Sequence, residues 1–300
     1  MNQANLSRFE QALRSRGCRA ALLASPWTLT WLTGYASPIQ TGPSPFEGGP
    51  ALGWWQDGGL TVIASDAEAP ALRDCGAEVR EYAGYTVDAP LNVAARQAAV
   101  VQDVVSAGCG PGKVAVELRF LPAALLPAVQ AALGSAELTP FDGALDALRA
   151  VKTPAEIELL RAALALCDLS QAEMAEAVRP GVSEIALWGQ VKTRLEVTAG
   201  GRLPVLADLV GGPRTGDIGG LPGEYVLAAG DPVIADIVPR LNGYWGDICG
   251  THFAGEPPAE LRKLYTVVHD TLRRGIDAVQ PGVRACDLDA LLRGAIRDAG

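Results

Sequence analysis

Two aspartates, Asp236 and Asp247, stand on either side of the dipeptide Asn242-Gly243. Asn-Gly between alternating apolar runs is a strong signal for a two-residue β-hairpin turn. A turn centred there places Cys249 opposite Asp236, and it likewise places Val238 opposite Asp247. Because strand side chains alternate between faces, the two carboxylates share one face as diagonal neighbours, with Cβ atoms roughly 7 Å apart.

Two carboxylates on one apolar strand face repel each other and resist ionisation. A divalent cation between them removes that conflict, and oxygen ligands suit Mn²⁺ or a similar ion. Two metal ions about 3.5 to 4 Å apart can share a water, lower its pKa towards about 7 and polarise a scissile carbonyl. The pair therefore indicates metal-assisted hydrolysis. The alternative is that both side chains are solvated on the outward face of an edge hairpin.

The elements that hold this hairpin fall into two predicted domains, 1–150 and 151–300. The first half alternates strand-like and helix-like runs, which indicates an α/β layer domain. Strands are expected around 52–56 and 60–64, joined by the turn signal Asp57-Gly58-Gly59. The second half begins at Thr153, where Pro154 and Glu156 complete a capping-box helix start.

An internal repeat organises the second domain. The hexapeptide 177–182 (AVRPGV) recurs as 278–283 (AVQPGV), with a long amphipathic helix before each copy and another helix after it. Strands follow the first helix pair, at 204–209, 231–238 and 244–253. In a duplication, the matching strands of the second copy would lie roughly 100 residues further on. We therefore expect the sequence to be cut short at Gly300.

Composition excludes several classes. The net charge of −9 and the absence of a basic run argue against a nucleic-acid partner. No apolar run is long enough to span a bilayer, and the N-terminus lacks a secretory pattern. The six cysteines are scattered without a C-x-x-C pair, so we expect reduced thiols and a cytoplasmic protein.

Several stretches resemble the pita-bread metallopeptidase family, which includes prolidases, aminopeptidases P, methionine aminopeptidases and creatinases. They are Val151–Arg161 (VKTPAEIELLR), Arg179–Val182 (RPGV), Gly212-Pro213, Gly230-Asp231 and the Asp236-x₁₀-Asp247 spacing. Thr30–Tyr35 (TWLTGY) resembles the creatinase-like N-terminal domain of that family. The resemblance implies an α/β creatinase-like domain followed by an α+β pita-bread domain built from a duplicated ααβ unit.

The resemblance implies a Xaa-Pro dipeptidase that cleaves short proline-containing peptides as a homodimer. Asp236 would chelate one metal and Asp247 would bridge two, with Mn²⁺ expected and Co²⁺ or Zn²⁺ possible, and a dinuclear metal-bound hydroxide would attack. An aminopeptidase P-like enzyme on longer Xaa-Pro peptides is the close alternative. A catalytically impaired pseudoenzyme or binding module is the alternative from another class. No catalytic side chain is assigned.

Three departures from the family pattern stand out. The further His and two Glu ligands of the family do not occur before Gly300. The usual active-site His is replaced by Gly219, within Ile218-Gly219-Gly220. Cys249 stands where Thr is common. The two histidines do not fill the gap, because His252 falls on the opposite strand face from Asp247 and His269 lies on a predicted helix, so both are expected to be structural or solvated.

Overall fold

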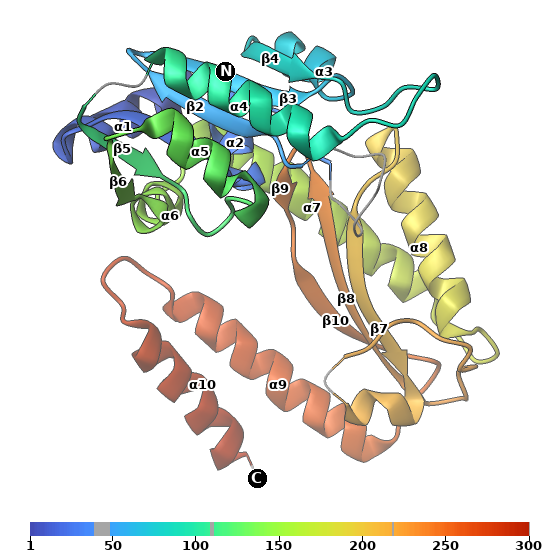
Figure 1. The fold of residues 1–300 in the computed structure, drawn as a ribbon. Helices are drawn as coiled ribbons and strands as arrows, with labels where there is room; N and C mark the ends of the chain where they lie inside the picture. The colour runs from blue at the N-terminus through green and yellow to red at the C-terminus, as the bar shows by residue number, and fades with distance from the viewer. Residues whose placement is uncertain (39–48, 109–110, 218, 300) are drawn as a thin grey trace. The chain divides into compact units, whose positions relative to one another are not determined.

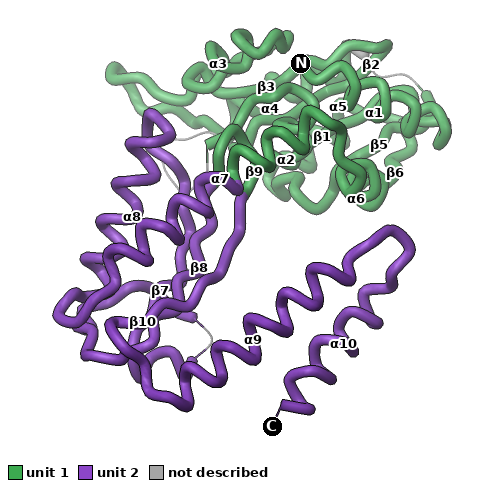
Figure 2. The backbone as a smooth tube through the Cα atoms, turned by 180° about the vertical axis from the view of Figure 1, so that it is seen from behind, with its two compact units in different colours: residues 1–163, 240–245 green, residues 164–239, 246–300 purple. Residues whose placement is uncertain are grey.

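The computed structural model describes residues 1–38, 49–108, 111–217 and 219–299. The chain forms two compact units (Figure 2). Unit 1 comprises residues 1–163 and 240–245, and unit 2 comprises residues 164–239 and 246–300. A helix and a β-hairpin therefore each run from one unit into the other. The predicted boundary between two domains, 1–150 and 151–300, stays a prediction.

Unit 1 is an α/β layer structure around a six-stranded mixed sheet (Figure 1). Its strands are ordered β4-β3-β2-β1-β5-β6, with β1 parallel to β5 and antiparallel to β2. In chain order its elements are α1 (Gln3–Ser15), β1 (Cys18–Leu23), α2 (Pro26–Thr33), β2 (Leu52–Gln56), β3 (Gly59–Ser65), α3 (Ala69–Asp74), β4 (Glu78–Tyr82), α4 (Val93–Gly108), β5 (Lys113–Val116), η1 (Ala123–Leu125), α5 (Leu126–Leu133), β6 (Glu137–Pro140) and α6 (Asp142–Ala150).

Helices cover both faces of this sheet, so its central strand is buried twice. Ala20 and Leu22 of β1 pack with α4 and α5, whereas Ala21 and Leu23 pack with α1 and α2. A strand buried on both faces has a continuous apolar sequence instead of an alternating one. This explains why residues 20–23 contain no polar side chain.

Two local predictions for unit 1 are confirmed. The β2–β3 hairpin turns through Asp57 and Gly58 with positive φ angles of 50° and 85°. In the predicted capping box, the Thr153 backbone N–H donates to Glu156 Oε2 at 2.9 Å, and the Glu156 N–H donates to Thr153 Oγ1 at 3.3 Å.

Unit 2 is built on an antiparallel sheet in the order β10-β8-β7, and β9 also pairs with β8. The elements from the end of unit 1 onward are α7 (Pro154–Ala177), α8 (Glu184–Ala199), β7 (Val205–Gly211), η2 (Gly212–Gly216), β8 (Pro232–Leu241), β9 (Tyr244–Trp245), β10 (Ile248–Phe253), α9 (Ala259–Ala278) and α10 (Ala285–Asp298). The sequence predicted one strand over 244–253. The structure corrects this to two strands separated at Gly246 and Asp247, while Gly246 N–H still donates to Pro239 O at 2.9 Å and keeps the register.

One face of β8 packs against α7. Val233, Ala235 and Ile237 are fully buried, and Gln171 of α7 donates from Nε2 to the Ala235 carbonyl at 3.0 Å. Strand alternation places Asp236 on the face that points away from α7. We call this the Asp236 face and define it by Ile234, Asp236 and Val238.

The predicted repeat coincides with the observed helix boundaries. Helix α7 ends at Ala177 and α9 at Ala278, while α8 begins at Glu184 and α10 at Ala285, so both boundaries recur at the same offset. Helices α9 and α10 pack against each other closely enough that a Cβ on Gly275 would lie 2.6 Å from Leu292 Cδ2. In the described part of the second copy, two helices are present and no strand follows.

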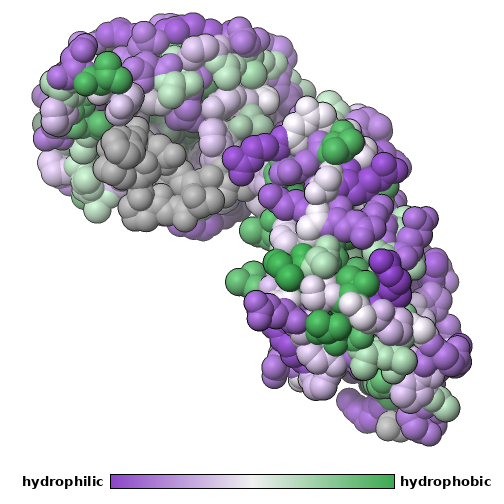
Figure 3. Space-filling view, turned by 90° about the vertical axis from the view of Figure 1, so that its right-hand side faces the viewer, coloured by the Kyte–Doolittle hydropathy of each residue, from purple (hydrophilic) through white to green (hydrophobic). Residues whose placement is uncertain are grey.

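The two copies differ in how much apolar surface they bury. Leu187, Val191 and Leu195 of α8 are fully buried, whereas Leu264 and Leu272 of α9 are 57% and 55% exposed. Figure 3 shows hydrophobic side chains gathered on a face of unit 2. Across the described residues, no helix combines the length and apolar character needed to cross a bilayer.

Candidate metal centre

The hairpin that carries the two aspartates has the predicted register. Asn242 and Gly243 turn with positive φ angles of 50° and 85°, as a type I′ turn requires. Cys249 lies directly opposite Asp236, and Arg240 lies opposite Trp245. The register of the hairpin is therefore as predicted. Asp247 lies two positions before Cys249, in the break between β9 and β10, and its charge acts on Asp236.

Asp236 is a partly buried carboxylate with an unsatisfied oxygen. Its Oδ1 atom is inaccessible to solvent and has no hydrogen-bond partner. Burial raises the pKa of Asp236 above its usual value, and the charges of Asp247 and Asp208 raise it further. The alternative of two solvated, outward-pointing side chains therefore does not describe Asp236.

Asp247 contributes negative charge from the edge of the same face. Its side chain is exposed, in the break between β9 and β10. Its charge also raises the pKa of the neighbouring Cys249 thiol, after burial and Asp236 as the larger causes. Cys249 lies directly opposite Asp236, and the charges of Asp236, Asp247 and Asp208 all act on its thiol.

A third carboxylate, Asp208, reaches this face from β7. Asp208 lies directly opposite Asp236 in the β7–β8 ladder. Side chains opposed in this way point to the same face, with Cβ atoms about 5 Å apart. The sequence analysis did not identify Asp208. The available signal was an acidic residue inside the apolar strand 205–210, but only the pairing of β7 with β8 shows where it points.

Gly219 is packed directly on this third carboxylate. A Cβ at position 219 would lie 2.3 Å from Asp208 Oδ2, and the glycine has a φ of 79°. Any side chain here would therefore collide with Asp208 and strain the backbone. Ile218, named with Gly219 in the sequence analysis, lies outside the described residues.

The loop that carries Gly219 is fixed by Glu184 at the start of α8. Glu184 is fully buried and accepts hydrogen bonds from the backbone N–H groups of Gly211 at 2.7 Å and Gly223 at 2.8 Å. The Arg214 guanidinium also donates to Glu184. These bonds tie both ends of residues 211–223 to one side chain, so the position of Gly219 beside Asp208 is held by the loop.

The residues present fit a divalent cation as part of its ligand set. Asp236 and Asp247 present two carboxylates, and the buried Oδ1 of Asp236 has no hydrogen-bond partner. A hard divalent cation would neutralise such a pair. Among the described residues, no group of three or more His, Cys, Asp or Glu side chains converges closely enough to hold a metal ion. Asp236 and Asp247 could thus supply two ligands, and their assignment as metal ligands stays a prediction.

The two histidines lie away from the carboxylates. His252 Nε2 lies 2.9 Å from Gln171 Oε1, on the face covered by α7. Because Gln171 Nε2 donates to Ala235 O, its Oε1 accepts and His252 Nε2 donates. His269 is exposed on α9 and stacks on Tyr265. These contacts agree with the prediction that neither histidine belongs to the Asp236 face.

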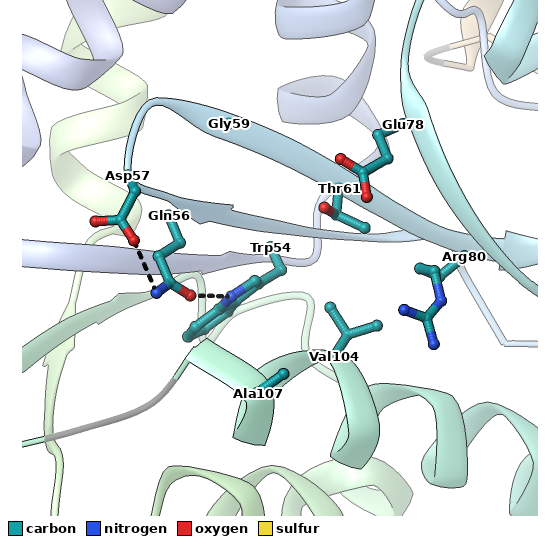
Figure 4. A pocket seen from close by; sticks show the side chains of 9 residues that line it. All are labelled: Trp54, Gln56, Asp57, Gly59, Thr61, Glu78, Arg80, Val104 and Ala107. Atoms are coloured by element: carbon teal, nitrogen blue, oxygen red, sulfur yellow. Dashed lines mark hydrogen bonds between the residues drawn. The ribbon is translucent and has the colours of Figure 1, made fainter.

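Unit 1 contains a separate surface pocket of about 310 Å³ (Figure 4). It is lined by Trp54, Gln56, Asp57, Gly59, Thr61, Glu78, Arg80, Val104 and Ala107. Three of its polar side chains are joined, since Trp54 Nε1 donates to Gln56 Oε1 and Gln56 Nε2 donates to Asp57 Oδ2. None of Asp208, Asp236 and Asp247 lines this pocket, so we give it no part in their chemistry.

Comparison with known proteins gives the family. The chain is 25% identical over 303 residues to a Xaa-Pro dipeptidase of Lactobacillus helveticus, covering 99% of this chain and 78% of that protein. It is 26% identical over 164 residues to the Xaa-Pro dipeptidase of Pyrococcus furiosus, covering 55% and 47%. The chain spans about half the length of the first curated relatives that it matches.

The structure gives the same result for the fold. The prolidase structure from Pyrococcus horikoshii superposes with a TM-score of 0.79 at 16% identity, covering 99% of this chain and 78% of that one. The creatinase/prolidase N-terminal domain profile matches residues 5–151, and the profile of metallopeptidase family M24 matches residues 158–300. The creatinase-like and pita-bread architecture is therefore confirmed. The chain therefore consists of a creatinase/prolidase N-terminal domain followed by a domain of metallopeptidase family M24.

Proposed function

We propose that this chain is the metal-binding part of a Xaa-Pro dipeptidase-like enzyme that hydrolyses the peptide bond before proline in dipeptides. The observation that carries this proposal is the pair Asp236 and Asp247 on one face of the M24 sheet, with the buried Oδ1 of Asp236 left without a partner. Relatives named Xaa-Pro dipeptidase support the choice of substrate class.

In this proposal Asp236 would help to hold one divalent ion, and Asp247 would help to hold two. When bound, the two ions activate water and polarise the scissile carbonyl. Mn²⁺ is the proposed ion, since carboxylate oxygens suit it, and Co²⁺ or Zn²⁺ would be weaker candidates. The homodimer and the cytoplasmic location stay predictions from the sequence.

The protein's own contribution is to hold both carboxylates on one side of a rigid hairpin. The type I′ turn and the ladder from Cys249 to Phe253 fix the register, so that a shift of one residue would move Asp236 to the helix side. Gln171 braces the backbone beside Asp236 through the Ala235 carbonyl. Binding energy of an ion is then not spent on ordering the ligands.

The test is Mn²⁺-stimulated release of proline from a dipeptide by the full chain as its gene encodes it. We expect Asp247→Asn to lower kcat/KM by about 100-fold or more, because a bridging charge is lost. The matched control is Asp277→Asn, which removes one exposed carboxylate from α9. Calorimetric titration with Mn²⁺ should show weaker binding only in the first variant.

Three outcomes would count against the proposal. Equal rates for the wild type and Asp247→Asn would exclude the metal mechanism. Intact Mn²⁺ binding without any cleavage would favour the pseudoenzyme alternative. Faster cleavage of longer Xaa-Pro peptides than of dipeptides would instead favour an aminopeptidase P-like enzyme.

A further inference from the structure

Asp208 is a carboxylate of the Asp236 face to which the proposed metal chemistry gives no role. It stands directly opposite Asp236 on the neighbouring strand, and its charge acts on both Asp236 and Cys249. Its side chain is partly exposed. Within the described ranges, its carboxylate has no hydrogen-bond or ion-pair partner, and Arg214 of the loop that carries Gly219 is bonded to Glu184.

The arrangement does not make Asp208 a third metal ligand. In the part of the chain that the structure describes, no three candidate ligands converge on one point, and this includes the trio of Asp208, Asp236 and Asp247. Asp208 is one strand away from Asp236, about 5 Å between Cβ atoms. Its Oδ2 atom lies against Gly219, so the carboxylate is turned towards the Gly219 loop and not towards a point shared with Asp236 and Asp247.

The Asp208 carboxylate occupies space that a side chain at position 219 would otherwise fill. Gly219 leaves open the position that Asp208 Oδ2 fills, since even one methyl group there would approach that oxygen to 2.3 Å. The loop that presents Gly219 is fastened at both ends to the buried Glu184. An unpaired carboxylate that is held against a fixed glycine, on a partly exposed face, is suited to contact a cationic group of a ligand.

We propose that Asp208 determines substrate specificity and selects peptides whose residue before proline is Lys or Arg. This inference rests on the proposed function, which puts the scissile bond over Asp236 and Asp247. The α-ammonium of such a peptide lies one carbon from the scissile carbonyl and thus beside the metal ligands. The side chain of Lys or Arg carries its positive charge further from the scissile carbonyl, and this charge would pair with Asp208 on the neighbouring strand.

The test compares Lys-Pro with norleucyl-proline, which lacks only the side-chain ammonium. Dissociation constants are measured by calorimetry with EDTA present, so that no cleavage occurs, and KM and kcat are measured with Mn²⁺. We expect the wild type to prefer Lys-Pro about five-fold in Kd and KM, with kcat little affected, as for a partly exposed ion pair. Asp208→Asn should bring that ratio close to one, and salt should reduce the wild-type ratio.

Two further variants separate charge selection from general effects. Glu224→Gln removes an exposed carboxylate directly after residues 211–223, and it should retain the wild-type ratio. Gly219→Ala keeps Asp208 but displaces its carboxylate, so the ratio should fall, with thermal melting used to confirm that the variant is folded.

The results distinguish this inference from the proposed function. A Lys-Pro preference in Kd without proline release would contradict the proposed function and leave the selection by Asp208 supported. Proline release with equal affinity for both peptides would overturn the role of Asp208 alone. A ratio that survives Asp208→Asn in the folded protein would overturn it as well.

Discussion

Two acidic side chains of unit 2, Glu184 and Asp236, have opposite surroundings. Glu184, at the first turn of α8, is fully buried and accepts hydrogen bonds from two backbone N–H groups and from Arg214. Asp236, in the middle of β8, has a buried Oδ1 without a partner and faces two further carboxylates. One carboxylate is saturated with donors, and the other is surrounded by like charge.

We interpret Glu184 as a structural carboxylate and Asp236 as a carboxylate suited to bind a ligand. A buried charge costs several kcal/mol unless donors or an opposite charge compensate it. The chain supplies that compensation for Glu184 and uses the result to fix the Gly219 loop. Asp236 receives no such compensation from the chain, and in the proposed function a bound cation would provide it. The predictions below test each half of this contrast.

The largest effect is expected at Glu184. Glu184→Ala leaves Arg214 and two backbone N–H groups without their acceptor, and it should lower the free energy of unfolding by about 3 kcal/mol. Chemical denaturation measures this loss. Glu176→Ala, at an exposed position of α7, should change stability by no more than about 0.5 kcal/mol. Equal losses would mean that Glu184 is not a structural anchor.

The second effect is stabilisation by metal. A free Mn²⁺ concentration about 100 times Kd should raise the free energy of unfolding by about 2.7 kcal/mol, because the ion binds the folded chain preferentially. Thermal melting with and without Mn²⁺ measures this gain. Asp236→Asn should abolish most of it, and a full gain in that variant would place the ion elsewhere.

A smaller effect of opposite sign is expected without metal. Asp236→Asn replaces an unpartnered, partly buried charge with a neutral group of the same shape, so the EDTA-treated variant should be more stable than the wild type by about 1 kcal/mol at pH 7. The comparison is made by chemical denaturation. A destabilised variant would show that Asp236 has a structural partner like that of Glu184.

The smallest effect concerns the opposite face of the sheet. Burial lowers the pKa of His252 below its usual value. Between the lowered pKa and the usual value of about 6.5, the unfolded chain binds more protons than the folded one, so stability falls as pH drops through this window. His252→Gln should flatten the dependence of melting temperature on pH between about 5 and 7. An unchanged slope would assign the acid sensitivity to other groups.

Some features of the Asp236 face could be predicted from the sequence, and others could be found only in the structure. The turn at Asn242-Gly243 follows from local dihedral preferences, and the sharing of one face by Asp236 and Asp247 follows from the two-residue period of a strand. The capping box at Thr153 and the boundaries of the repeated helices are also local patterns. Each depends on residues close together in the chain, which is why the sequence alone could predict them.

The remaining features depend on which distant segments meet. Asp208 joins the Asp236 face because β7 pairs with β8 across the intervening residues 212–231. The sequence interpreted Gly219 as the loss of a side chain, whereas the structure shows that Asp208 occupies the space. Glu184 was not identified from the sequence, because its donors come from the distant residues 211, 214 and 223. Side-chain burial and the partners of a carboxylate are set by tertiary contacts, because a short-range pattern contains no information on what the rest of the chain brings to that point.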